Sequence, residues 1–289
     1  MNIWKYILII IIIIYFLIII RFNNKTNNEY TIYQMYNPSK EVLEDNLSKL
    51  SPSIITNSLD NYPEISKINI DFLKQQTSKN LKISLYKHES KKSTLIYSTL
   101  DSFLKFIEQI KETSKLSTYY YILDDQDILK KIGMYDKFNT YANYYLCPWT
   151  IMKNYKLSIE YQNFKSDIFQ VDNNRLLILH LEGSRKYYLF NPDQQSKLYP
   201  SNKYNNGYKK SLINFWDTKQ NESYPLFKDS QYMEISIYPG QILYIPNKWW
   251  YCYQNIDNNM VVKIESTFFS NLVEKSPKIF KYLGHKMGF

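Results

Sequence analysis

Residues 239–251 read Pro-Gly-Gln-Ile-Leu-Tyr-Ile-Pro-Asn-Lys-Trp-Trp-Tyr. The Pro-Gly pair is typical of a turn, and the apolar run at 241–245 predicts a short buried strand. A second proline and two indole side chains follow directly. Further strands are predicted at 157–161, 168–172, 176–181, 185–190, 233–237 and 260–266. Many short strands separated by turn signals favour a jelly roll, in which two sheets pack face to face.

The first half of the chain mixes helices with strands. A helix is predicted after Pro38-Ser39, and residues 99–113 carry the apolar stripe of a second helix. Alternating residues at 81–86 and a tyrosine-rich run at 118–123 predict strands. The expected fold is therefore mainly β with flanking helices. We expect one domain over 31–289, made of a mixed helical part (31–155), a β-barrel (156–270) and a C-terminal tail (271–289).

The N-terminus is a long apolar segment. Residues 3–20 are apolar except for Lys5, and a helix of that length spans roughly 27 Å, close to the ~30 Å hydrocarbon layer. No small-residue cleavage site follows, so the sequence predicts an uncleaved transmembrane signal anchor in a single-pass membrane protein. Residues 21–30 are polar and are expected to form a tether. The charges on the two sides of the span leave its orientation open.

Composition narrows the function classes. The net charge of +9 is spread along the chain without an arginine-rich run, so specific nucleic-acid binding is not expected. The 29 tyrosines fit a codon bias toward A and T more simply than a special chemistry. Cys147 and Cys252 do not make a disulfide framework, and whether they pair is left open. Three histidines are few for a metalloenzyme.

Two motifs resemble the cupin-like branch of the JmjC oxygenases. The first runs from Gln170-Val171-Asp172 through Gly183-Ser184-Arg185 to Leu189-Phe190-Asn191-Pro192, in the style of the asparaginyl-hydroxylase-like members. The second is residues 239–251. The likeness covers roughly residues 45 to 270, and it is more specific in the second half than in the first.

The resemblance implies an iron site that has lost most of its ligands. In this family two histidines and one carboxylate hold Fe(II), with places left for 2-oxoglutarate and O₂. The histidine positions fall on Gln170 and Tyr251, the carboxylate on Asp172, and the lysine that binds 2-oxoglutarate on Arg185. Only Asp172 keeps a ligand-type side chain, because an amide and a neutral phenol are poor substitutes for imidazole. Asp172 is therefore the one candidate metal ligand, and Arg185 the one candidate for the cosubstrate.

One other residue enters the site by strand parity. His180 has the parity of Leu176 and Ile178, so it can face the barrel interior. The simpler interpretation is a histidine hydrogen-bonded at the end of a buried strand, and we favour it. Cys252 follows Tyr251 directly, and strand alternation turns it to the opposite face.

Three hypotheses follow. The first is a membrane-anchored cupin-like protein that has no cofactor and acts by binding, with an anionic small molecule or a peptide in the barrel. The second is an active Fe(II)- and 2-oxoglutarate-dependent protein hydroxylase with unusual ligands. The third is a structural scaffold of a membrane-associated assembly, viral if the codon bias is taken as a guide. One ligand-type residue out of three favours the first.

Overall fold

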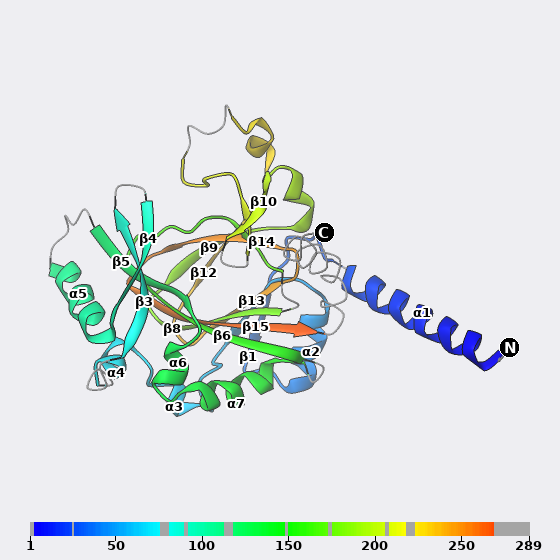
Figure 1. Ribbon diagram of the computed structural model, residues 1–289, viewed down its shortest axis with the longest axis horizontal. Helices are drawn as coiled ribbons and strands as arrows, with labels where there is room; N and C mark the ends of the chain where they lie inside the picture. Colours follow the sequence, from blue (N-terminus) through cyan, green and yellow to red (C-terminus); the bar gives the residue numbers. More distant parts are fainter. Residues whose placement is uncertain are drawn as a thin grey trace, which may run out of the picture.

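Two β-sheets packed face to face form the body of the chain, with helices outside the larger sheet (Figure 1). The structure is a computed structural model that describes residues 3–24, 26–75, 81–89, 92–112, 118–147, 150–172, 175–205, 208–217 and 223–268. The mainly β architecture with flanking helices is as the sequence predicts, and two facing sheets are the arrangement of a jelly roll. The predicted tail at 271–289 lies outside the described residues.

The larger sheet contains nine strands within the described residues. In spatial order they are β1 (Tyr33–Tyr36), β2 (Ser53–Thr56), β13 (Ile242–Pro246), β8 (Arg175–Glu182), β15 (Asn259–Phe268), β6 (Thr150–Glu160), β5 (Thr118–Asp125), β3 (Lys82–Glu89) and β4 (Lys92–Thr99). Strands from the mixed first half therefore extend the same sheet as strands of the predicted barrel. Only the β1–β2 pair is parallel among the pairs of this sheet.

The smaller sheet contains six strands within the described residues. They are β10 (Pro200–Asn205), β11 (Tyr208–Ser211), β7 (Phe169–Gln170), β14 (Trp250–Asn255), β9 (Arg185–Phe190) and β12 (Met233–Ile237). The strand expected at 168–172 is shorter than predicted, because only Phe169 and Gln170 pair as β7.

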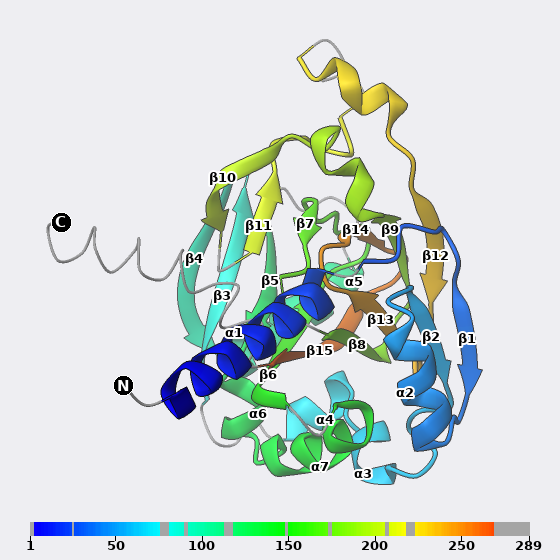
Figure 2. The same cartoon turned by 90° about the vertical axis from the view of Figure 1, so that its right-hand side faces the viewer.

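The helices are short and gather mainly beside the larger sheet (Figures 1 and 2). They are α2 (Lys40–Ser48), α3 (Pro63–Ser66), α4 (Ile70–Gln75), α5 (Leu100–Glu112), α6 (Ile128–Lys131) and α7 (Tyr135–Tyr145), with 3₁₀ turns η2 (Pro192–Ser196) and η4 (Pro225–Asp229). The helix expected at 99–113 is confirmed as α5. Helix α2 begins where predicted, because the Ser39 hydroxyl accepts a hydrogen bond from the Val42 amide.

The core has one layer on each face of the larger sheet. In β8, Leu177 and Leu179 pack under the helices, whereas Leu176 and Ile178 pack between the sheets. A strand covered on both faces has no polar side to show, and so this run is apolar throughout. The layer between the sheets is the barrel interior.

Strand β14 separates the barrel interior from the outer face of the smaller sheet. Tyr251 and Tyr253 lie in the interior, whereas Trp250 and Cys252 pack in a third apolar cluster on the other side. The alternation expected for Cys252 is thus confirmed. Cys252 and Cys147 are both free thiols.

The N-terminal segment is a helix, α1 (Ile3–Asn24), which projects away from the sheets (Figure 1). Its side chains from Trp4 to Leu17 are almost all exposed. The transmembrane anchor predicted over residues 3–20 is not supported, since no helix in the described part of the chain is long and apolar enough to cross a membrane.

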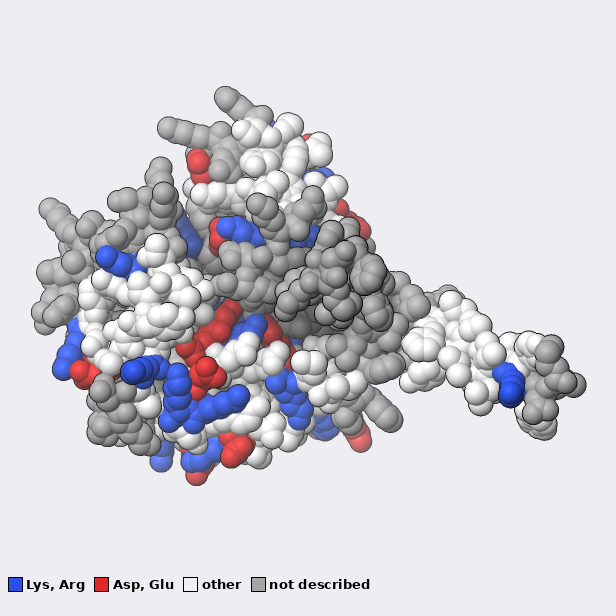
Figure 3. All heavy atoms as spheres, in the orientation of Figure 1, with Lys and Arg blue, Asp and Glu red and all other residues white. Residues whose placement is uncertain are grey.

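Charged side chains of both signs are interspersed over the described part of the face in Figure 3. A nucleic-acid-binding surface instead gathers lysine and arginine along one stripe. The charged side chains on this face therefore resemble ordinary solvated surface residues, as the spread of lysines along the sequence suggests.

The turn from β8 to β9 depends on Gly183. Its φ is +72°, and a Cβ at this position would lie 2.0 Å from the backbone oxygen of Asn258. Any other residue must therefore move the β14–β15 turn. Gly133 has nearly the same φ, +75°, but nothing lies within 4 Å of its Cβ position.

We expect Gly183→Ala to lower the free energy of unfolding far more than Gly133→Ala. Both changes carry a backbone cost of roughly 1–2 kcal/mol for an L-residue in the left-handed region. Gly183→Ala adds overpacking of roughly 1–3 kcal/mol. Urea denaturation of the two variants measures the difference, and equal losses would show that the contact with Asn258 does not constrain the turn.

Candidate functional site: the interior of the barrel

The positions expected to bind iron do not converge. Strand pairing places Gln170 opposite Trp250, and Phe169 opposite Tyr251. Directly paired residues share one face of a sheet, so Gln170 and Tyr251 point to opposite faces. The two positions expected to hold the family's histidines, Gln170 and Tyr251, are therefore not brought together.

Gln170 binds protein groups outside the barrel interior. Its side-chain amide donates to Oε1 of Gln195 at 3.2 Å and to the backbone oxygen of Lys248 at 3.3 Å. Asp172 follows the end of β7 and is half-buried. Within the described residues its carboxylate has no hydrogen-bond or ion-pair partner. Asp172 is thus a lone carboxylate rather than one member of a ligand set.

Tyr251 is the one of the three that faces the interior. It is buried, its ring stacks on that of Tyr253 at 6.5 Å, and the Lys263 ammonium lies 5.9 Å from its ring centre. Its hydroxyl has no hydrogen-bond partner in the described structure. Burial raises the pKa of Tyr251 well above its usual value, so the side chain is a neutral phenol.

Arg185 also points into the interior, where its charge meets that of Glu160. Both side chains are fully buried, and Nη2 of Arg185 lies 2.9 Å from Oε2 of Glu160. The Arg185 guanidinium also donates to Oδ1 of Asn255 at 2.8 Å and to the Tyr187 hydroxyl at 3.3 Å. Its centre lies 4.0 Å from the ring centre of Tyr253. The guanidinium is therefore bound on several sides.

The Glu160 carboxylate has partners on both oxygens. Oε1 accepts from the Tyr253 hydroxyl at 2.7 Å, and Oε2 accepts from Asn255 at 3.1 Å as well as from Arg185. Burial lowers the pKa of Arg185, but the charge of Glu160 together with the contacts to Tyr187 and Tyr253 outweighs burial and leaves that pKa above its ordinary value. The pair is thus a fully buried salt bridge with hydrogen bonds on both oxygens of the carboxylate.

Two more ion pairs lie along the inward faces of β6, β5 and β15. Lys263 binds Asp124 at 2.9 Å, and Lys156 binds Glu265 at 2.9 Å. Ser158 adds a hydrogen bond to Asp124 at 3.1 Å. Burial raises the pKa of Asp124, but the charges of Lys263 and Lys156 and the hydrogen bonds from Lys263 and Ser158 together outweigh burial and hold this pKa below its usual range. With Arg185–Glu160, these pairs set three cations against three carboxylates, so their charges cancel.

His180 faces the interior, as its strand parity predicts. It is fully buried, and Nε2 lies 3.0 Å from the Tyr187 hydroxyl. Burial, together with the nearby charge of Arg185, lowers the pKa of His180 well below its usual value, so the ring is neutral. The favoured interpretation, a hydrogen-bonded histidine at the end of a buried strand, matches this geometry.

Comparison with known proteins identifies the family. A family model described as "Cupin-like domain" matches residues 38–264, which is more than half of the chain. The chain belongs to the cupin-like domain family. The JmjC-type resemblance seen in the sequence is thereby confirmed.

Individual relatives match only a short part of the chain. HSPB1-associated protein 1 of Homo sapiens is 29% identical over 82 residues, which is 28% of this chain and 17% of that protein. Its homolog in Danio rerio is 27% identical over 84 residues, or 28% of this chain and 18% of that protein. JmjC domain-containing protein D of Dictyostelium discoideum is 24% identical over 91 residues, which is 32% of this chain and 20% of that protein. The matched stretch is thus a fifth or less of each relative's length.

The side chains of this cupin-like domain do not fit the iron and 2-oxoglutarate that the family resemblance implies. Gln170 faces away from Tyr251, and Tyr251 is a neutral phenol. In the described residues, no group of three or more His, Cys, Asp or Glu side chains is placed to hold a metal ion. Arg185, at the position of the cosubstrate-binding lysine, already holds the carboxylate of Glu160.

The interior carboxylates and lysines were missed in the sequence. The alternation in β6 and β15 was visible, and it placed Lys156, Glu160, Lys263 and Glu265 on the face opposite the apolar residues. Such residues are normally read as the solvent side. Here both faces are buried, so the polar face lines the barrel. The balance among these four inward residues, two lysines and two glutamates, was the only available signal.

We expect Glu160→Gln to destabilise the domain strongly. The change leaves the Arg185 charge buried without its counter-ion, which costs roughly 3–5 kcal/mol. The matched control is Glu234→Gln, which breaks the Lys186–Glu234 pair (2.8 Å) between β9 and β12, where the side chains are 35% and 49% exposed. That change is expected to cost less than about 1 kcal/mol. Chemical denaturation distinguishes the two, and a similar loss in both variants would contradict the buried-pair assignment.

Proposed function

We propose that this cupin-like domain acts by binding a partner and not by oxygenase catalysis. One observation carries the proposal: the Arg185–Glu160 pair fills, with a carboxylate of the chain itself, the place where the family's lysine holds the carboxylate of 2-oxoglutarate. A cosubstrate would have to displace a carboxylate that is held by three side chains. Removing one partner from such a pair is costly, so the interior resists this exchange.

The same pair argues against the anionic ligand that the sequence suggested for the barrel. An anion would have to compete with Glu160 for Arg185, with Asp124 for Lys263, or with Glu265 for Lys156. Each cation already has a carboxylate within 3 Å. We therefore place the binding function on the surface of the domain.

Metal and cosubstrate binding tests the proposal directly. The full-length chain in detergent, titrated with Mn(II) or Fe(II) in the presence and absence of 2-oxoglutarate, is expected to give no binding heat. An Asp172→Ala variant should behave identically, because Asp172 has no ligand-type neighbour. Micromolar binding that disappears in Asp172→Ala would overturn the proposal and favour the hydroxylase alternative.

We also propose that α1 attaches the domain to a lipid surface. Trp4, Leu8 and Leu17 are 79%, 61% and 60% exposed, and the isoleucines between them are similarly open. A contiguous exposed apolar surface of this kind marks a membrane or protein contact. Tryptophan and a long lysine such as Lys5 suit a lipid interface, because each has an apolar body and a polar end.

Flotation with phosphatidylcholine vesicles checks the attachment. The full-length chain should rise with the vesicles, and 1 M salt should not release it if the contact is apolar. The double variant Leu8→Glu, Ile12→Glu should stay behind, because charged side chains cost roughly 3 kcal/mol each in lipid. Leu95→Glu, on β4, is the matched control, since Leu95 is also 50% exposed. If the unchanged chain, the double variant and the Leu95→Glu variant all float equally, or if none of them floats, the proposed attachment through α1 is contradicted.

A further inference from the structure

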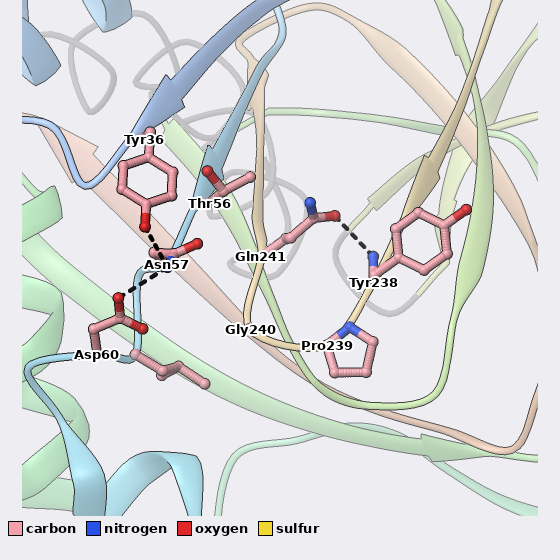
Figure 4. Close-up of a pocket in the computed structure, with 9 residues that line it drawn as sticks. Tyr36, Thr56, Asn57, Asp60, Tyr238, Pro239, Gly240 and Gln241 are labelled. Atoms are coloured by element: carbon pink, nitrogen blue, oxygen red, sulfur yellow. Dashed lines mark hydrogen bonds between the residues drawn. The ribbon is translucent and has the colours of Figure 1, made fainter.

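A groove of about 430 Å³ opens at the end of β13 that lies away from Tyr251 (Figure 4). It is formed where β1 and β2 end beside the Pro239–Gly240 turn. The side chains that matter to the argument are Tyr36, Asn57, Asp60, Tyr238 and Gln241. The groove is thus separate from the interior and from the positions at which the family binds iron.

Hydrogen bonds within the groove fix which groups it offers to a ligand. The Asn57 amide donates to the Tyr36 hydroxyl at 3.0 Å and to Oδ2 of Asp60 at 2.9 Å (Figure 4). Both donors of Asn57 are therefore directed at the protein. Its carbonyl oxygen and the other oxygen of Asp60 have no partner among the described residues. The groove consequently presents two adjacent acceptors, one of them charged.

The charges of the residues that line the groove narrow the class of ligand. The chain carries a net charge of +9, yet no lysine or arginine is among the described residues that line this groove. Tyr36 and Tyr238 are 73% and 53% exposed, and their rings are open to a ligand. A cation gains from a carboxylate and from the face of an aromatic ring. An arginine or lysine side chain therefore fits this lining, and an anion does not.

Strand β1, whose last residue lines the groove, has an open edge. It is the terminal strand of the larger sheet and pairs only with β2 in the described structure. The amides of Tyr33 and Asn37 donate toward β2, to Pro52 and Thr56. Because alternate residues of a strand bond to opposite sides, the amides and carbonyls of Gln34 and Tyr36 face the open edge. Such an edge is a template for an added strand.

We propose that the β1 edge and the groove together bind an extended peptide segment of a partner protein that carries an arginine or lysine. The backbone of the peptide pairs with Gln34 and Tyr36, and the basic side chain enters the groove toward Asn57 and Asp60. Main-chain bonds supply affinity in this mode, and the side-chain pocket supplies specificity. This inference rests on the proposed binding function and names its ligand class.

Selection from a random twelve-residue peptide display library tests the inference. The full-length chain in detergent is the target, and Asp60→Asn is the counter-target. We expect enriched peptides to share a basic residue and to lose about tenfold in affinity for Asp60→Asn, measured by fluorescence anisotropy with synthetic peptides. An Asp257→Asn variant, which removes an exposed carboxylate elsewhere, should bind them normally.

The strand-pairing part has its own matched pair of variants. Gln34→Pro removes an amide that faces the open edge, so the β1–β2 ladder is kept while peptide pairing is lost. Gln34→Ala keeps the amide and should bind normally. Three outcomes would overturn the inference. The selection could give no enrichment over Asp60→Asn, the enriched peptides could lack a basic residue, or both Gln34 variants could bind the peptides equally. These results do not test the binding of metal or 2-oxoglutarate. Only the detection of that binding would overturn the proposal that the domain does not act as an oxygenase.

Discussion

The need to neutralise charge inside the barrel governs this molecule. Moving one isolated ion out of water costs several kcal/mol even after the protein relaxes, and six ionisable side chains lie in ion pairs between the sheets. They are stable there because each cation has a carboxylate within 3 Å and because hydroxyl and amide groups complete the shells. The positions of β5, β6, β9, β14 and β15 are thereby linked through their inward side chains.

This constraint accounts for the ion pairs of the interior, whereas the residues at the family's iron-binding positions do not converge there. A functional oxygenase needs open coordination positions and an unpaired cation for its cosubstrate. In this chain the cation at that position is Arg185, and it is paired with Glu160 from the facing sheet. The tyrosines around it provide hydrogen bonds and ring contacts, and the apolar residues of β8 and β13 fill the rest. The interior now stabilises the fold.

Much of the fold could be predicted from the sequence, and for identifiable reasons. Strand β8 and helix α5 have strong apolar patterns, and the turn chemistry of Pro239–Gly240 marks the start of β13. The short strands β1 and β2 have four residues each, too few to give a pattern, and they are defined by their pairing. The arrangement of the site was harder to predict from the sequence, because it depends on knowing the strand register to within one residue. A shift of one position in a strand moves a side chain to the other face, and this separates Gln170 from Tyr251.

That register adds a geometric reason to the chemical one for the poor fit of iron at these positions. Histidines placed at Gln170 and Tyr251 would still point to opposite faces of the smaller sheet, and Glu160 would still hold Arg185. Two histidines at these positions alone therefore would not meet on the interior face of the sheet. A binding function then has to use surfaces whose polar groups are not already paired. The open edge of β1 and the acceptors of Asn57 and Asp60 are surfaces of that kind.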